Sequence, residues 1–164
     1  MTKAIFLDRD GVINQERKDY VKKLDEFKIL DKIADAINII KSHGFLVIII
    51  TNQSAINRKL VSVETLNKIH EKLQSYLEKY DTSFDQVYFC PHMPSENCEC
   101  RKPKPGLIIQ AVTDFKIDLS QSYMIGNSET DVQAATNAGC KGILLKENQT
   151  LLEVVMDLFE SEKI

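Results

Sequence analysis

Short apolar runs alternate with segments of helical periodicity along this chain, and that alternation most constrains how it can fold. The apolar runs are typical of buried strands, and they cover residues 4–7, 45–50, 87–89, 123–125 and 143–145. The segments between them place apolar residues at helical spacing, and they cover residues 31–43, 62–80, 105 onward, 129–138 and 149 onward. This order predicts an α/β fold, a doubly wound Rossmann-like parallel sheet with helices on both faces.

The length of 164 residues suits one domain over residues 1–164, and no repeat or linker interrupts it. A net charge of -3 offers no basic surface for nucleic acid. The longest apolar run, Phe45 to Ile50, is too short to span a bilayer. The N-terminal segment reaches Asp8 before the core of a signal peptide could form. We therefore expect a cytoplasmic protein, without nucleic-acid or membrane partners, whose thiols stay reduced.

Polar side chains follow four of the predicted strands at the point where each strand ends. In doubly wound sheets, function gathers at these carboxyl ends. Each segment alone is compatible with an ordinary turn or helix N-cap, but four in succession indicate one site. The candidate residues are Asp8, Asp10, Thr51, Asn52, Gln53, Arg101, Lys102, Asn127 and Asp131.

The order of these segments resembles the haloacid dehalogenase superfamily of phosphotransferases: Asp-x-Asp-Gly, then Thr, then Lys, then a glycine followed by an acidic motif. The wording "FLDRDGVIN", "TNQS", "CRKPKPG" and "SYMIGNSETDVQAATNAG" is similar to the D-glycero-D-manno-heptose 1,7-bisphosphate phosphatases and their relatives, the histidinol-phosphate phosphatases. The resemblance covers nearly the whole chain. Only about twenty residues separate Arg9 from Leu30, too few for the large cap domain that many relatives carry.

The resemblance implies a Mg²⁺-dependent phosphatase. Asp8 is expected to be the nucleophile that forms an aspartyl-phosphate, and Asp10 the general acid and base. Mg²⁺ would be held by Asp8, the carbonyl of Asp10 and the side chain of Asn127, with Asp131 supporting them. The residues expected to bind the substrate or its phosphate are Thr51, Asn52, Gln53, Arg58, Arg101 and Lys102.

Residues 88–106 hold three of the four cysteines and all four prolines. Cys90, His92, Cys98 and Cys100 follow the spacing C-x-H-x5-C-x-C, whose ligand types and number suit a structural Zn²⁺. A disulfide is the rival interpretation, disfavoured in a reducing compartment, and a catalytic cysteine is weaker still. The fourth cysteine, Cys140, is expected to be a buried thiol.

The other two histidines, His43 and His70, are expected to face solvent and to have no role in the site. Both lie in predicted helical segments.

The sequence constrains the identity of the substrate less than it constrains the type of reaction. "DGVIN", Ser54 and "KPKPG" favour a heptose bisphosphate, and Arg58 resembles an arginine that family members direct at the far end of the substrate. The compact cysteine loop instead resembles histidinol-phosphate phosphatases, and Ala55 departs from the usual glycine. Asn127 stands where the superfamily has an aspartate, so a weakly active enzyme or a phosphate-binding module is the alternative from another class. We expect a monomer acting on a small sugar phosphate.

Overall fold

A five-stranded parallel sheet forms the centre of the computed structural model, which describes residues 1–161. The strand order is β3-β2-β1-β4-β5, so β1 lies between β2 and β4. All neighbouring strands are parallel, and the α/β prediction is confirmed. The strands are β1 (Lys3–Leu7), β2 (Phe45–Asn52), β3 (Gln86–Cys90), β4 (Tyr123–Gly126) and β5 (Lys141–Leu144).

The apolar runs make strands because both faces of the sheet are covered. Successive side chains of a strand point to opposite faces. In β1, Ile5 and Leu7 enter one apolar core, whereas Ala4 and Phe6 enter the other. A continuous apolar run is therefore needed where a half-exposed strand would need an alternating one.

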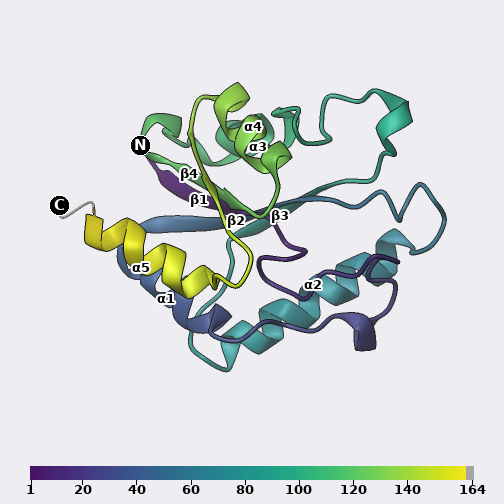
Figure 1. Cartoon of the computed structure of the whole chain (residues 1–164), viewed down its shortest axis with the longest axis horizontal. Helices are drawn as coiled ribbons and strands as arrows, with labels where there is room; N and C mark the ends of the chain where they lie inside the picture. Colours follow the sequence, from purple (N-terminus) through teal and green to yellow (C-terminus); the bar gives the residue numbers. More distant parts are fainter. Residues whose placement is uncertain (162–164) are drawn as a thin grey trace.

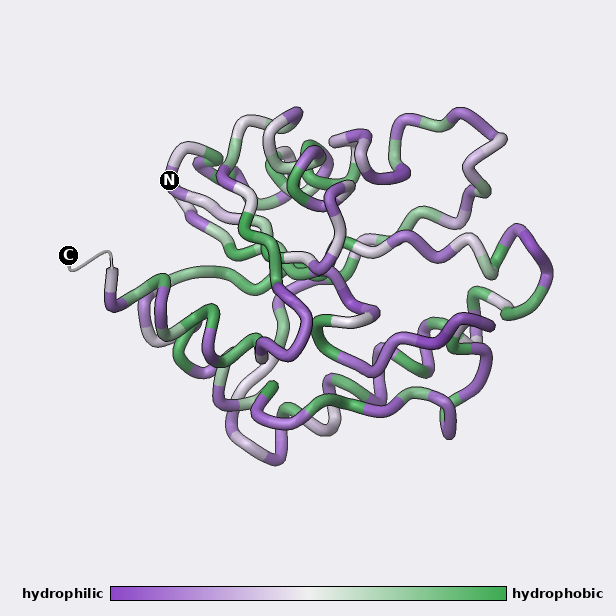
Figure 2. The backbone as a smooth tube through the Cα atoms, viewed as in Figure 1, coloured by the Kyte–Doolittle hydropathy of each residue, from purple (hydrophilic) through white to green (hydrophobic). Residues whose placement is uncertain are grey.

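Helices cover the two faces unequally, with α1, α2 and α5 on one side and α3 and α4 on the other (Figure 1). Hydrophobic residues lie mainly along the strands and the adjoining helix surfaces, whereas the loops at the right-hand edge are largely hydrophilic (Figure 2). The helices are α1 (Ile33–Ser42), α2 (Val63–Glu78), α3 (Gly106–Phe115), α4 (Glu129–Ala138) and α5 (Leu151–Ser161).

The ends of the helices follow from local chemistry. The hydroxyl of Ser62 accepts a hydrogen bond of 3.0 Å from the backbone N–H of Thr65 and caps α2, as its sequence predicts. The far end of this helix differs from the prediction, because α2 ends at Glu78. Tyr80 consequently lies beyond the apolar face and is 51% exposed.

The connection between β1 and α1 contains only a short 3-10 helix, Leu24–Glu26, which confirms that no large cap domain is inserted there. Within the described chain, every helix is too short or too polar to span a bilayer. After β3 the chain crosses to the other side of β1 and enters β4. Such a reversal of strand order opens a crevice at the carboxyl ends of the flanking strands, here β1 and β4.

Candidate active site

A cavity of about 240 Å³ opens at the carboxyl ends of the strands. It gathers residues that follow β1, β2, β3 and β4, as the strand-end argument predicts. Its lining consists of Asp8, Asp10, Glu16, Arg17, Tyr20, Val21, Asn52, Gln53, Ser54, Arg58, Arg101, Lys102, Asn127, Ser128, Thr130 and Asp131.

A buried lysine joins two carboxylates at the base of this cavity. The Nζ of Lys102 lies 2.9 Å from Oδ1 of Asp8 and 2.6 Å from Oδ1 of Asp131, and it donates to the carbonyl of Ile50 at 2.9 Å. The other oxygen of Asp131 accepts from the backbone N–H of Ser128 at 3.1 Å and so caps α4. The lysine is therefore held with its charge directed at the end of β1.

Glycine is required next to this ion pair. A Cβ atom at Gly126, the last residue of β4, would collide with the carboxylate of Asp131. The absence of a side chain thus allows the first turn of α4 to approach the sheet closely.

The charged groups at the base of the cavity shift one another's pKa values. Burial raises the pKa of Asp8 to about 6, with a further increase from Asp131 and an opposing effect of Lys102. Burial by itself would lower the pKa of Lys102, but Asp8 and Asp131 outweigh it and hold that pKa above its usual range. At neutral pH the site therefore presents an ionised aspartate beside a fixed ammonium group.

Asp10 is held by three donors from two loops. Its Oδ1 accepts from Nη2 of Arg9 at 2.8 Å and from Nδ2 of Asn14 at 2.9 Å, and its Oδ2 accepts from Nε2 of Gln53 at 2.9 Å. Burial alone would raise the pKa of Asp10, but the charge of Arg9 and these hydrogen bonds lower it below its usual value. Without substrate, Asp10 is thus a fixed, ionised carboxylate.

The last residues of β2 and Gln53, which follows them, contribute to the cavity in a different way from the one the sequence suggests. Asn52 and Gln53 line the cavity, whereas Thr51 is completely buried and is not among the described lining residues. The hydroxyl of Thr51 accepts a hydrogen bond of 2.8 Å from Nε2 of Gln53. The side chain of Asn52 pairs with the backbone of Lys102, accepting from its N–H at 3.0 Å and donating to its carbonyl at 3.3 Å.

Asn127 lies at the end of β4, where the superfamily pattern has an aspartate. Its Nδ2 lies 3.5 Å from Oε2 of Glu16, an exposed carboxylate at the rim of the cavity that sequence reasoning did not select. A Cβ atom at Gly11 would collide with the Asn127 side chain, so the β1 loop and the end of β4 approach closely here. Glu16 could only have been noticed by its position within the loop that follows Asp8.

Two arginines reach the cavity from opposite loops. Nε of Arg58 donates to Oγ of Ser54 at 3.2 Å, and its guanidinium lies 5.7 Å from the ring centre of Tyr20. Arg101 donates from Nη1 to the carbonyl of His92 at 3.3 Å. The structure therefore brings Arg58 beside Tyr20 in the cavity lining, and Arg101 beside the cysteine loop.

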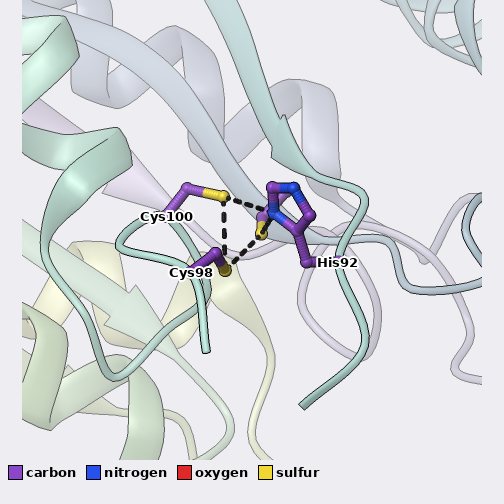
Figure 3. Close-up of side chains that lie close together, drawn as sticks. His92, Cys98 and Cys100 are labelled. Carbon is purple, nitrogen blue, oxygen red and sulfur yellow. Dashed lines mark hydrogen bonds between the residues drawn. The ribbon is translucent and has the colours of Figure 1, made fainter. Parts of the chain in front are cut away.

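The cysteine loop brings the four candidate zinc ligands together. One ligand atom from each of Cys90, His92, Cys98 and Cys100 lies within 4.8 Å of the others, and Figure 3 shows the imidazole and the thiols turned toward one another. Nδ1 of His92 lies 3.3 Å from Sγ of Cys90 and 3.1 Å from Sγ of Cys100, and Sγ of Cys98 lies 3.5 Å and 3.6 Å from those sulfurs. Ligand atoms on a tetrahedron of about 2.3 Å radius are about 3.8 Å apart. The cluster could therefore bind zinc.

The same distances bear on the rival interpretation of this loop. The sulfur atoms are much further apart than the ~2.05 Å of a disulfide, and every cysteine is free in the described chain. The pKa of the Cys98 thiol is lowered to about 7, because hydrogen bonds from the Arg101 backbone and neighbouring thiols outweigh its burial. Cys140 lies outside the cluster and is buried, as predicted.

The cluster is linked directly to the base of the cavity. Cys90 is the last residue of β3, and Cys100 precedes Arg101 and Lys102. The backbone N–H of Gly106, at the start of α3, donates to the carbonyl of Glu99 at 3.1 Å and closes the loop. Folding of this loop thus determines where the ammonium group of Lys102 lies.

The prediction that His70 faces solvent is wrong. His70 is only 4% exposed, and its Nε2 lies 3.2 Å from Nη1 of Arg9. Arg9, which stands between Asp8 and Asp10 in the sequence, is completely buried. His43 is exposed as predicted and stacks on the ring of Phe159. The sequence signal for His70 was its place beside the apolar positions of α2, next to Ile69.

Comparisons with known proteins agree with this geometry. The HAD-hydrolase-like family model matches residues 99–158. A D-glycero-beta-D-manno-heptose-1,7-bisphosphate 7-phosphatase of Helicobacter pylori is 44% identical over 144 residues, which cover 87% of this chain and 83% of the relative. A D-glycero-alpha-D-manno-heptose-1,7-bisphosphate 7-phosphatase of Campylobacter jejuni is 39% identical, with coverage of 88% and 82%.

A solved structure is also similar over nearly the whole chain. The D,D-heptose 1,7-bisphosphate phosphatase of B. bronchiseptica, in complex with magnesium and phosphate, superposes with a TM-score of 0.90 at 33% identity and covers 98% of this chain and 99% of its own. Similarity of this extent and level shows shared ancestry. The chain therefore belongs to the heptose-1,7-bisphosphate 7-phosphatases of the haloacid dehalogenase-like hydrolases.

Proposed function

We propose that this chain removes the 7-phosphate of D-glycero-D-manno-heptose 1,7-bisphosphate through an aspartyl-phosphate formed on Asp8. The observation that carries the proposal is the ion pair of 2.9 Å between Asp8 and the buried Lys102 at the base of a polar cavity. An ionised aspartate needs no base to attack phosphorus, and the ammonium group offsets the charge of the phosphoryl oxygens.

The reaction then needs one proton donor that becomes a proton acceptor. An oxygen of Asp8 forms a bond to phosphorus as the bond from phosphorus to the sugar oxygen breaks, and Asp10 gives its proton to the departing alkoxide. Asp10 next takes a proton from water, whose oxygen attacks phosphorus and releases inorganic phosphate from Asp8. The carboxylate found in the free protein is the state required for the second step, so Asp10 has to be protonated when the substrate binds.

Phosphate oxygens are proposed to be held by the loops that surround this base. The backbone after Thr51, the side chains of Asn52 and Gln53, and Arg101 supply donors on one side, and Lys102 supplies a point charge. Arg58, beside Tyr20, is proposed to bind the second phosphate at the far end of the bisphosphate.

A Mg²⁺ ion fits the donor set of the cavity. Hard oxygen ligands suit this ion, and Asp8, Asp10 and Asn127 all line the cavity. They would offer a carboxylate, a backbone carbonyl and an amide oxygen. These three residues would hold the ion, and Asp131 would support them through Lys102. When bound, Mg²⁺ neutralises phosphoryl charge in the transition state.

Zinc is proposed for the cysteine cluster, in a structural role. Four protein ligands leave no coordination position for substrate, and the separations of the ligand atoms support a closed tetrahedral site. We further propose that the protein works as a monomer in the cytoplasm, where the three cysteine ligands stay reduced.

Neither alternative function is favoured. The curated relatives are heptose bisphosphate 7-phosphatases although the cysteine loop here is compact, so loop length is a poor guide to histidinol phosphate as the substrate. A phosphate-binding module is disfavoured because Asp8, Asp10 and Lys102 are all present at one cavity.

The proposal is tested by comparing kcat/KM for the heptose bisphosphate and for histidinol phosphate with Mg²⁺ present, and by following the products with phosphorus NMR. We expect the bisphosphate to be preferred and the 1-phosphate to remain on the sugar. Arg58→Ala should raise KM mainly for the bisphosphate, because histidinol phosphate has no second phosphate for Arg58 to bind. A preference for histidinol phosphate, or release of the 1-phosphate, would overturn the assignment.

A further inference from the structure

We propose that Arg9 and His70 form a buried pair that positions Asp10, the guanidinium by holding the carboxylate and the imidazole by holding the guanidinium. The inference rests on the proposed function, in which Asp10 transfers the proton. Neither residue contacts the reacting atoms, so both are positioning residues and not catalytic ones.

Arg9 is buried to an unusual degree for a charged side chain. It is 0% exposed, its guanidinium carbon lies 5.4 Å from the ring centre of Phe27, and its one ion pair in the described chain is the bond of 2.8 Å to Asp10. A buried charge must be paired and hydrogen-bonded to be tolerated. The guanidinium of Arg9 is therefore held by Asp10, His70 and Phe27, and it fixes one oxygen of Asp10 in turn. Its Nε has no hydrogen-bond partner among the described residues.

His70 completes the environment of this guanidinium. All nitrogens of arginine carry hydrogen atoms and only donate, so Nε2 of His70, 3.2 Å from Nη1, must be the accepting nitrogen. The proton then lies on Nδ1, which is buried without a hydrogen-bond partner among the described residues, and the ring is neutral. A charged ring would place two cations in contact, and burial together with Arg9 lowers the pKa of His70 to about 3.

The pair therefore links a helix to the active-site loop. His70 is part of α2, whose buried residues Ile69 and Leu73 pack in the apolar core beneath the sheet. A histidine here has no packing advantage over leucine, but it gives the buried N–H of Arg9 an acceptor. Without that acceptor, Nη1 would be left unpaired, a penalty that favours rotation of the guanidinium away from Asp10.

The position of Asp10 matters because proton transfer needs close geometry. A displacement of about 1 Å in a reacting group can cost about 100-fold in rate. The neutral donors Asn14 and Gln53 also bind Asp10, so loss of the charged donor should misplace the carboxylate without releasing it completely.

Two substitutions at His70 separate positioning from packing. His70→Leu keeps the apolar volume and removes the acceptor, whereas His70→Gln keeps an acceptor. We expect His70→Leu to lower kcat by about 10- to 100-fold with KM for the bisphosphate changed less than about threefold. We expect His70→Gln to restore most of the loss. Leu73→Ala creates a cavity in the same helix and removes a side chain that cannot accept a hydrogen bond from Arg9. It is the control for destabilisation and should keep its kcat at a temperature where it is folded.

The leaving group supplies a second readout that a structural role would not move. The nitrophenolate of p-nitrophenyl phosphate departs without a proton, whereas a sugar alkoxide requires one. In single-turnover measurements of phosphoenzyme formation, His70→Leu should slow the sugar phosphate by about tenfold or more and the aryl phosphate by less than about threefold. Equal slowing of both substrates, no slowing, or the same slowing in Leu73→Ala would overturn the inference. An inactive wild-type protein would instead count against the proposed function, because both readouts compare variants with an active parent.

Discussion

Lys102 shows how much of the site depends on single residues. Its ammonium group is buried, contacts the carboxylates of Asp8 and Asp131, and donates a third hydrogen bond to the carbonyl of Ile50. Removing one partner of a buried ion pair costs several kcal/mol because the other charge stays uncompensated. The motif resemblance pointed to Lys102, Asp8 and Asp131, but only the structure shows that one cation joins both carboxylates.

Asn127 is the residue that departs from the superfamily pattern, and Asn127→Asp should increase Mg²⁺ affinity. The added carboxylate would face Glu16, whose Oε2 lies 3.5 Å from the present Nδ2. The gain comes from attraction between the added carboxylate and the bound Mg²⁺. Two opposite unit charges about 4 Å apart attract by roughly 4 kcal/mol at an effective dielectric constant near 20, before hydration reduces this. A gain of about tenfold, or ~1.4 kcal/mol, is therefore expected.

Calorimetric titration with Mg²⁺, with activity as a second readout, measures this gain. Glu129→Gln is the matched control, because that exposed carboxylate lies in the first turn of α4 and is not among the described cavity residues. Unchanged affinity in Asn127→Asp would mean that position 127 is not a metal ligand.

The strands and helices were predictable where one physical requirement determined the sequence. Strands buried on both faces need continuous apolar runs, and Ser62 marks the start of α2. Apolar patterns and helix caps do not predict which side chains of different elements contact one another. The burial of His70 depends on Arg9, which lies 61 positions away along the chain, so no helical pattern could reveal it. Thr51 follows the predicted strand of residues 45–50 but lies within β2, which extends to Asn52, and the fold turns its hydroxyl to Gln53.

The cysteine loop should depend on bound zinc for its stability. We expect about one zinc per chain by metal analysis, and a lower melting temperature after chelation, because the free energy of metal binding adds to that of folding. Cys90→Ser should destabilise the protein far more than Cys140→Ser, since both thiols are buried but only Cys90 belongs to the cluster.

Metal analysis without zinc, combined with rapid alkylation of Cys98 and Cys100 in the native protein, would contradict a structural metal site. The two cysteines are partly exposed, so a reagent can reach them if no metal holds them.

His70 should make the protein sensitive to acid. Its pKa falls from 6.5 in the unfolded chain to about 3 in the fold, so between these values the unfolded state binds more protons. The contribution to stability is fully present above about pH 6.5 and is lost progressively as the pH falls toward about 3. His70→Gln cannot take up this proton and should flatten the acid side of the curve by up to ~1.4 kcal/mol per pH unit.

Urea denaturation at a series of pH values measures the slope. His43→Gln is the control, because that histidine is exposed. The same acid slope in the parent and in His70→Gln would show that His70 does not titrate on unfolding as described.

At the scale of the molecule, the strand order explains why residues from four loops share one cavity. β1 is central, and β2 and β3 are added on one side of it. After β3 the chain crosses over, and β4 and β5 are added on the other side. The order of motifs along the sequence predicted that the loops would meet. It could not predict the size of the cavity, the approach of Glu16 or the contact of Arg58 with Tyr20, because these depend on how the loops pack against each other.

The central claim is that Asp8 carries the phosphoryl group during turnover. The most direct test is rapid acid quenching of the protein during turnover of the heptose bisphosphate, followed by mass mapping of the phosphorylated peptide. We expect one phosphoryl group on Asp8, formed and consumed at rates that match kcat, and none in Asp8→Asn. Phosphate release with Asp8 never phosphorylated, or full activity in Asp8→Asn, would contradict it.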